Sequence, residues 1–323
     1  MKVARFANAE GPEALEIRDE AIPEPGAGQV RLKMKALGLN RAEALFLRGQ
    51  YLEAPDLPSR IGIEGAGVVD AVGDGVDESL VGTRAGVVCA VNTRGFGVAG
   101  EYAVVNADML LPDIASFDDE SLAAFWVAYL TAYEGLIGLG QLQKRQSVIL
   151  TAASSSVGLA GLQIAASCGA QAIATTRTKA KAARLKEAGA DDVIITSESE
   201  GFGEDRFDVA FDAVAGPSLE ALAMAMKSRG RMVVYGLLDG LAGTPFPAFP
   251  AFAKNLSLTA FHAGYHILAD PARREPAVAW LLEHAPSLKP TIDRVFPFDE
   301  LPAAYEYLEA SGQFGKIVVK LEG

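Results

Sequence analysis

Apolar residues from position 148 onward fall into short runs separated by amphipathic segments, a pattern typical of alternating strands and helices. The first run, Val148–Leu150, meets a cluster of small residues and is followed by an amphipathic segment from Leu159 to Ala170. Six such runs are mostly apolar on both faces, as expected for a parallel sheet covered by helices. The runs are Val148–Leu150, Gln171–Thr176, Asp192–Ile195, Phe207–Asp212, Arg231–Tyr235 and Leu256–Phe261. The pattern predicts an α/β fold with a doubly wound, parallel six-stranded sheet.

The flanking segments have a different pattern, rich in strands before residue 120 and mixed after residue 266. The N-terminal strands are predicted at Gln29–Ala36, within the glycine-punctuated stretch Gly62–Val76, and at Ala99–Val105. The C-terminal segment predicts a helix over Ala277–Glu283, a strand over Asp293–Pro297, a helix from Asp299 through Leu308 and a last strand over Gly315–Lys320. The simplest arrangement inserts a sheet domain, residues 122–266, into a β-rich domain formed by residues 1–121 plus 267–323.

The turn after Val148–Leu150 is a candidate phosphate site. Small residues let backbone N–H groups approach a pyrophosphate, and the N-terminus of the following helix favours negative charge. The candidate contacts are Ser154, Ser155, Ser156 and Val157. A purely structural strand–turn–helix has a similar sequence, because serines occupy positions where the glycine fingerprint has glycines.

The end of the second predicted strand favours NADP(H) over NAD(H). A fold that binds NAD places an acidic residue about 20 residues past the glycine turn, to hold the ribose 2′-hydroxyl. Here the position holds Thr176, Arg177 and Thr178, and no acid follows until Glu187. Arg177 and Lys181 are four apart, so at the start of a helix they are predicted to project from one face toward a 2′-phosphate. Ordinary basic residues on a solvated helix are the alternative.

Other cofactor contacts are expected just past the remaining strands, because a doubly wound sheet binds its ligand at the carboxyl ends of its strands. Loops without a ligand are the alternative at each position. The candidates are Thr196, Val214, Gly236, Leu237, Phe261 and His262.

Composition limits the partners of this 323-residue chain. Its net charge of −12 disfavours nucleic acid or an anionic membrane surface as a main partner. No apolar run reaches the ~20 residues of a membrane helix, and the N-terminus lacks the apolar stretch of a signal peptide. Two cysteines provide neither a disulfide framework nor a thiolate zinc lobe. A cytoplasmic protein is expected.

Several motifs resemble the zinc-independent quinone oxidoreductase branch of the medium-chain dehydrogenase/reductase superfamily. They are Gly38–Glu43 with Asn40, Arg48–Tyr51, Gly62–Gly67 followed by Val72-Gly73, Leu130–Tyr133, Leu185–Asp191, and Phe296–Lys320 with its Gly-Lys ending. The resemblance spans nearly the whole chain and implies that the β-rich domain is GroES-like and catalytic. It also implies that Asn40 and Tyr51 face the nicotinamide and substrate, with Thr131 and Lys316 near the cofactor. The departure is Ser154–Ser156, where the family usually has Gly-Gly.

The same motifs argue against a metal. Zinc enzymes of the superfamily carry Cys where Asn40 stands and His where Ile63 stands, and Val127 fills the usual third ligand position. Catalytic zinc needs three nitrogen, sulfur or carboxylate ligands. His262 and His266 could ligate only from one helix face, and a partly exposed pair is the commoner outcome.

Without a Lewis acid an alcohol is a poor substrate, whereas a polarised acceptor needs only hydrogen-bond support of its developing oxyanion. We therefore predict an NADPH-dependent reductase of a quinone or an α,β-unsaturated carbonyl. Tyr51 would assist the oxyanion, Asn40 would orient the substrate or the nicotinamide ribose, and Glu64 would be structural. A packed tyrosine and a turn-forming asparagine are the alternatives for the first two residues. The alternative functions are an enoyl-thioester or alkenal reductase, and a non-catalytic NADPH-binding sensor.

The segment Leu241–Phe252 spaces Phe246, Phe249 and Phe252 with prolines, which predicts an exposed apolar loop. Family members often dimerise by pairing the following edge strand, here Leu256–Phe261, which covers its open hydrogen-bonding groups. A homodimer is predicted. The alternative is a substrate lid folded onto its own subunit.

Overall fold

The computed structural model describes residues 1–89 and 97–322, which form two compact units. Unit 1 consists of Met1–Val127 with Pro290–Gly323, and unit 2 consists of Ala128–Lys289. The predicted range 1–121 plus 267–323 included residues 90–96 and Gly323, which lie outside the described residues.

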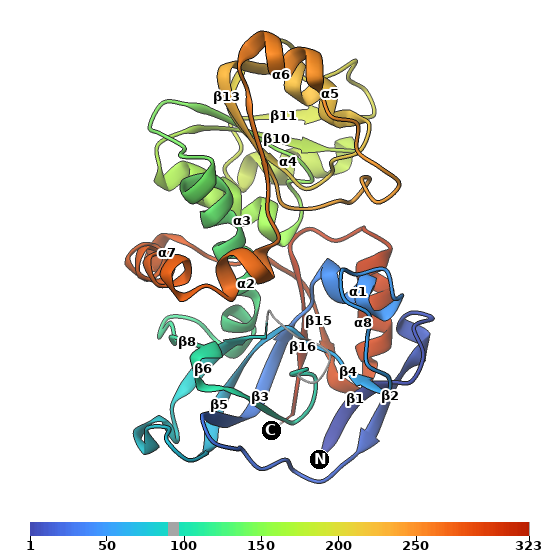
Figure 1. Cartoon of the computed structure of the whole chain (residues 1–323), viewed down its shortest axis with the longest axis vertical. Helices are drawn as coiled ribbons and strands as arrows, with labels where there is room; N and C mark the ends of the chain where they lie inside the picture. The colour runs from blue at the N-terminus through green and yellow to red at the C-terminus, as the bar shows by residue number, and fades with distance from the viewer. Residues whose placement is uncertain (90–96, 323) are drawn as a thin grey trace. The chain divides into compact units, whose positions relative to one another are not determined.

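Unit 2 is built on a parallel six-stranded sheet, as the apolar runs predict (Figure 1). Its strand order is β11-β10-β9-β12-β13-β14, so the chain starts in the middle, winds to one edge and then to the other. The strands are β9 Ser147–Leu150, β10 Gln171–Thr176, β11 Asp192–Ile195, β12 Phe207–Asp212, β13 Met226–Val234 and β14 Ser257–Ala260. The parallel pairing confirms the α/β doubly wound prediction.

Helices cover both faces of this sheet because successive strand residues point to opposite sides. Ile149 packs with Leu219 and Leu222 of the helix α5, Ser218–Met224. Leu150, the next residue, lies against Gly161 of the helix α3, Ser156–Ser167, on the other face. The helices of unit 2 are α3 Ser156–Ser167, α4 Ala182–Glu187, α5 Ser218–Met224, α6 Ala248–Lys254 and α7 Pro271–His284, with π-helical segments η4 Glu134–Leu139 and η6 Gly264–Leu268.

Unit 1 is β-rich, as predicted. A seven-stranded sheet runs in the order β15-β16-β3-β5-β6-β8 with β7 paired to β3, and a three-stranded sheet runs β2-β1-β4. The strands are β1 Lys2–Phe6, β2 Leu15–Asp19, β3 Gln29–Gly38, β4 Ser59–Arg60, β5 Glu64–Val72, β6 Arg84–Val88, β7 Tyr102–Asn106, β8 Leu110–Leu111, β15 Ile292–Pro297 and β16 Lys316–Lys320. Helices α1 Arg41–Leu47 and α8 Leu301–Glu309 contribute Phe46 and Tyr305 to a core with Phe6.

The units divide six residues after the first predicted boundary and 23 residues after the second. Helix α7 belongs to unit 2, where Trp280 packs against Tyr133 with ring centroids 5.5 Å apart. Lys289 is also held there, because its backbone N–H donates to Gln163 Oε1 at 2.8 Å. The sequence pattern changes at residue 267, but the packing of α7 extends the unit to Lys289.

Contrary to the expectation that no apolar run reaches the length of a membrane helix, the segment Asp119–Leu139, formed by α2 Asp119–Tyr133 and η4, is long and apolar enough to span a membrane by length and composition. Of its most apolar stretch, 78% is buried inside the protein. A core helix can have the same length and composition, because a helix that is apolar on all sides is buried either in a protein core or in a membrane.

Candidate cofactor site

The turn between β9 and α3 has the geometry of an anion site. Ser155 caps α3, with its Oγ accepting a hydrogen bond from the Gly158 N–H at 3.1 Å. A Cβ on Gly158 would lie 2.6 Å from the Ala153 Cα, so only glycine lets helix and turn approach this closely. The twelve-residue helix therefore begins, with its positive dipole end, at the predicted serines, among them Ser156.

The structure brings the predicted basic segment to this turn. Lys181 Nζ donates to Ser154 Oγ at 3.3 Å, which joins residues that follow two neighbouring strands. The prediction that Arg177 and Lys181 share one helix face is wrong. Arg177 directly follows β10 in a non-helical backbone, the 3₁₀ turn begins at Lys179, and Lys181 is the N-cap of α4. Arg177 is exposed.

The ends of β10 and β11 are tied together by backbone and hydroxyl groups. The Thr176 carbonyl accepts from the Thr196 N–H at 2.8 Å and from its Oγ at 3.4 Å. Thr176 Oγ accepts from the Thr178 N–H at 3.4 Å. These predicted residues therefore form one continuous edge at the carboxyl ends of the two strands.

A buried carboxylate that sequence reasoning missed shapes the loop after β12. Asp212 Oδ1 accepts from the Thr151 hydroxyl at 2.5 Å and from the Val214 N–H at 3.1 Å, and its Oδ2 accepts from the Ala215 N–H at 2.8 Å. Ala215 adopts a left-handed φ of 56°. The signal was present, since an acid ending an apolar strand before small residues is typical of a loop clamp.

The other half of the sheet edge holds the remaining predicted residues. The Phe261 N–H donates to the Val234 carbonyl at 3.0 Å, so the chain leaves β14 beside the end of β13. Gly236 lies against the Ala213 backbone, where a Cβ would come within 2.8 Å of the carbonyl oxygen. Leu237 is exposed. Thr131 is buried in α2.

A nucleotide phosphate fits this edge. The Tyr235 hydroxyl is buried beside Ser155, and it makes no hydrogen bond of normal geometry within residues 1–89 and 97–322. Burial raises the pKa of Tyr235, which keeps the hydroxyl protonated and able to donate. An unsatisfied buried donor next to a helix N-terminus and a glycine-tight turn is what an anionic ligand would complete.

The two residues predicted to be catalytic lie in unit 1. Asn40 precedes α1, and its side chain is held by protein groups: Nδ2 donates to Glu64 Oε1 at 3.0 Å and to the Gly38 carbonyl at 3.1 Å, while Oδ1 accepts from Lys316 Nζ at 2.7 Å. Tyr51 is half-buried and packs against the core of unit 1.

Lys316, predicted to lie near the cofactor, is 1% exposed and forms a short ion pair with Glu64. Glu64 Oε2 also accepts from the Val127 N–H at 3.0 Å, which agrees with the predicted structural role of this carboxylate. The ammonium of Lys316 is thus held by side chains of its own unit.

A second buried carboxylate, Glu43, adjoins this network. It accepts from the N–H groups of Asn40 at 2.6 Å and Ile63 at 2.9 Å, and from the Tyr305 hydroxyl at 3.1 Å. Burial raises the pKa of Glu43 to about 7, against the opposing effects of the Asn40 N–H and of Lys316. Two carboxylates and one ammonium are therefore enclosed together.

Comparison with known proteins identifies the family. Residues 26–115 match the alcohol dehydrogenase GroES-like domain, and residues 156–283 match the zinc-binding dehydrogenase domain. The rat synaptic vesicle membrane protein VAT-1 homolog is 30% identical over 94% of this chain and 80% of its own. The quinone oxidoreductase of Thermus thermophilus, also solved in complex with NADPH, is 29% identical with a TM-score of 0.85, over 99% of this chain and 100% of its own. The Escherichia coli quinone oxidoreductase complexed with NADPH is 25% identical with a TM-score of 0.89, over the same shares.

The chain belongs to the quinone oxidoreductase branch of the medium-chain dehydrogenase/reductase superfamily.

The described residues of this chain contain no group of three or more His, Cys, Asp or Glu side chains that could hold a metal ion. The two histidines considered as ligands have separate partners. His262 Nδ1 accepts from the Tyr265 N–H at 3.3 Å, and His266 Nε2 lies 2.8 Å from Glu134 Oε1.

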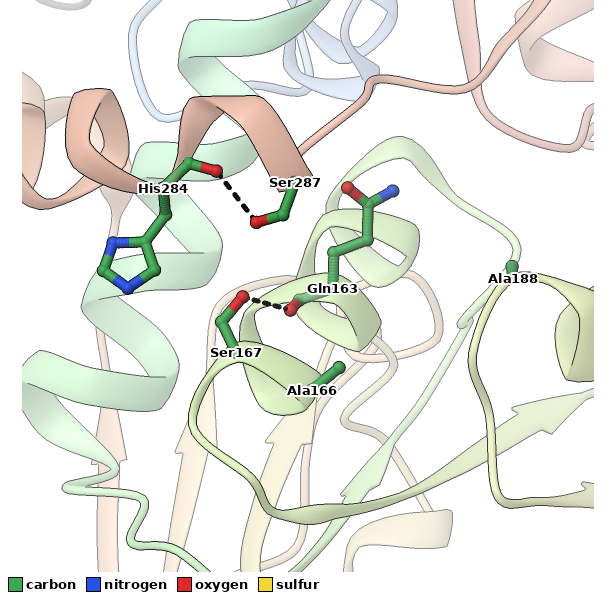
Figure 2. A pocket seen from close by; sticks show the side chains of 6 residues that line it. All are labelled: Gln163, Ala166, Ser167, Ala188, His284 and Ser287. Carbon is green, nitrogen blue, oxygen red and sulfur yellow. Dashed lines mark hydrogen bonds between the residues drawn. The ribbon is translucent and has the colours of Figure 1, made fainter.

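A hollow of about 420 Å³ lies elsewhere on unit 2 of this family member, lined by Gln163, Ala166, Ser167, Ala188, His284 and Ser287 (Figure 2). Both serine hydroxyls that line it already have partners. The Ser167 hydroxyl donates to the Gln163 carbonyl at 3.0 Å, and the Ser287 hydroxyl donates to the His284 carbonyl at 2.9 Å. The hollow borders the C-terminal end of α3, opposite the end where the candidate phosphate site lies.

Proposed function

We propose that the protein is an NADPH-dependent reductase whose acceptor is a quinone or an α,β-unsaturated carbonyl, and that it works without zinc. The observation that carries the proposal is the meeting of Ser154 and Lys181 beside the N-terminus of α3. This arrangement supplies a pyrophosphate site and, next to it, a cation and a hydroxyl for a further phosphate.

The choice of NADPH over NADH depends on the end of β10. An NAD-specific fold needs a carboxylate there to hold the ribose 2′-hydroxyl. This chain instead has Thr176 followed by the exposed Arg177, with Lys181 nearby. The two related quinone oxidoreductases whose structures contain NADPH support the same choice.

The choice of acceptor follows from the chemistry of the residues. The bound nicotinamide would supply a hydride, and the protein must stabilise the charge that develops on the acceptor oxygen. Asn40 and Ile63 stand where zinc enzymes of the superfamily carry ligands, so hydrogen bonds rather than a Lewis acid would support the acceptor. A quinone or enone is already polarised, so hydrogen bonds to its developing oxyanion are sufficient support.

We further propose that Tyr51 donates a hydrogen bond to the developing oxyanion and that Asn40 orients the substrate or the ribose. Tyr51→Phe removes the hydroxyl and keeps the ring that packs against the unit 1 core. We expect kcat to fall by about 10²–10³, the range for loss of one oxyanion donor. An unchanged kcat would remove Tyr51 from the chemistry.

The function is tested by following the absorbance of reduced nicotinamide in the presence of a chelator. NADPH and NADH are each offered with a quinone, a simple enone and an enoyl thioester. Turnover of quinone or enone with NADPH is expected. Turnover of only the thioester would favour an enoyl-thioester reductase, and NADPH binding without consumption of any acceptor would favour a sensor.

A cytoplasmic homodimer, paired through the edge strand β14, is part of this proposal. β14 lies at the end of the sheet order, and no strand of the described residues pairs with its other side. Phe246, Phe249 and Phe252 nearby are 69%, 73% and 89% exposed, and the last two lie on α6 rather than in the predicted loop. A monomer in sedimentation at micromolar concentration would exclude this pairing.

A further inference from the structure

Unit 2 contains a polar cluster that the proposed function leaves unused. Glu134 is buried, with 4% of its side chain exposed, and its Oε1 lies 2.8 Å from His266 Nε2 and 3.0 Å from Arg273 Nη1. Glu134 and His266 are 132 positions apart in the chain. The fold therefore brings a buried carboxylate to one nitrogen of an imidazole, which fixes the orientation of the ring.

Both members of this Glu134–His266 pair lie in π-helical segments. Glu134 opens η4, which continues α2, and His266 lies in η6, which follows β14. The π-helix is rare in proteins and is frequently found at functional sites, where its wider turn redirects a side chain. Ordinary packing of two helices does not need a π-helical turn in each of them, so the hydrogen bond that joins these two turns points to a functional role.

The pair lies on the half of unit 2 expected to face the acceptor. Ser154 and Lys181, at β9 and β10, define the end for the adenosine phosphate, so the other nucleotide belongs to the half formed by β12, β13 and β14. His266 follows β14, its N–H donates to the His262 carbonyl at 2.9 Å, and its ring packs 5.5 Å from that of Phe261. Glu134, the other member of the pair, follows Thr131 by three residues, a spacing that puts both side chains on one helix face.

We propose that His266, oriented by Glu134, is the acid that supplies the proton in this reduction, an inference that rests on the proposed function. Reduction adds a hydride and a proton to the acceptor. As the carbon–hydride bond forms, an electron pair moves onto the acceptor oxygen, which takes the proton from the imidazolium. The neutral imidazole regains a proton from water. Because Nε2–H donates to Glu134, the transferred proton is the one on Nδ1.

The charged and titratable groups facing His266 are Glu134 from η4, Arg273 from α7 with Asp270 behind it at 3.6 Å, and His262 one turn earlier. The acid form of the ring is needed for turnover, so kcat is expected to fall once a rise in pH removes the proton that is transferred.

The test compares His266→Gln with His284→Gln. Glutamine keeps a donor for Glu134 but cannot deliver a proton, and His284 is a matched control because it also bonds within its unit, to the Trp280 carbonyl at 2.9 Å. We expect His266→Gln to lower kcat by about 10²–10⁴, the usual contribution of a general acid, and to lose the pH dependence. We expect it to bind NADPH as the wild type does, and His284→Gln to keep wild-type kcat.

A second readout needs neither cofactor nor turnover. Proton–nitrogen NMR correlations of the histidine rings in the apo protein should show neutral His266 with its proton on Nε2, and Glu134→Gln should weaken that preference. This measurement keeps the proposal testable if His266→Gln does not fold. A neutral ring protonated on Nδ1 would overturn the proposal, as would wild-type kcat and pH dependence in His266→Gln. In that second outcome the reductase assignment stands, whereas NADPH binding without turnover in the wild type would refute both.

Discussion

Two clusters of this protein, one in each unit, hold a buried carboxylate in opposite ways. In unit 1, Glu43, Glu64 and Lys316 are all enclosed, and their partners among the described residues come from the same unit. In unit 2, Glu134 is enclosed but its partners His266 and Arg273 are 27% and 46% exposed. A closed network fixes geometry, because moving one charge leaves another unpaired in a medium of low dielectric constant. An open cluster can exchange protons with water.

The largest effect is expected from Lys316→Met. The substitution keeps an unbranched side chain but leaves Glu64 buried without its counter-charge, which typically costs about 3–5 kcal/mol of unfolding free energy. Lys320→Met is the matched control on the same strand, because Lys320 pairs with Glu120 at 2.8 Å with 60% of its side chain exposed. The control should cost at most about 1 kcal/mol. Urea unfolding measures the unfolding free energy of both variants, and an equal loss of stability in the two would contradict the closed network around Lys316.

The next effect is a pH dependence of stability due to Glu43. Its folded pKa of about 7 lies above the reference value of 4.5, so the folded protein binds the extra proton. The stabilisation is therefore complete below pH 4.5 and is lost as the pH rises through about 7. At about 1.4 kcal/mol per pKa unit, the loss is roughly 3 kcal/mol. The unfolding free energy of the wild type should fall over this pH range relative to that of Glu43→Gln, whose amide does not ionise, whereas the exposed Glu24→Gln should follow the wild type.

The smallest effect is expected at the open edge of unit 2. Lys181→Ala removes the cation beside Ser154 and should weaken NADPH binding about tenfold, or ~1.4 kcal/mol, without changing NADH binding or stability. Lys186→Ala on α4 is the control, since its ammonium lies 3.8 Å from Asp192 and is exposed. Titration of each variant with both cofactors measures the difference. Equal loss for NADPH and NADH would place Lys181 away from a 2′-phosphate.

Local pattern was enough to predict most elements of the fold. The runs Gln171–Thr176, Asp192–Ile195 and Phe207–Asp212 agree with β10, β11 and β12 to the residue. Such segments are recognisable because a buried parallel strand is apolar throughout and is bounded by turns, which are properties of neighbouring residues. The predicted loop over Leu241–Phe252 was wrong at its end, where α6 begins at Ala248 in spite of three nearby prolines.

The candidate cofactor edge was also accessible from sequence, because in a doubly wound sheet the carboxyl ends of the strands meet at one side. What sequence reasoning missed were the groups that hold this edge in shape. Asp212 clamps the loop after β12, and Tyr235 lies beside Ser155. Each depends on a partner from another strand, and a single sequence does not state which residues face each other across the sheet.

The class of fold, the six-stranded sheet, the serine turn and the lack of an acid directly after β10 could all be recognised in the order of the residues. The folded chain was needed to show that α7 belongs to unit 2, that Arg177 lies off the helix, that Lys316 is enclosed with Glu64, and that Glu134 meets His266. The physical reason is distance along the chain. Periodicity and turn chemistry act over a few residues, whereas burial and charge pairing depend on which segments pack together after the chain has folded.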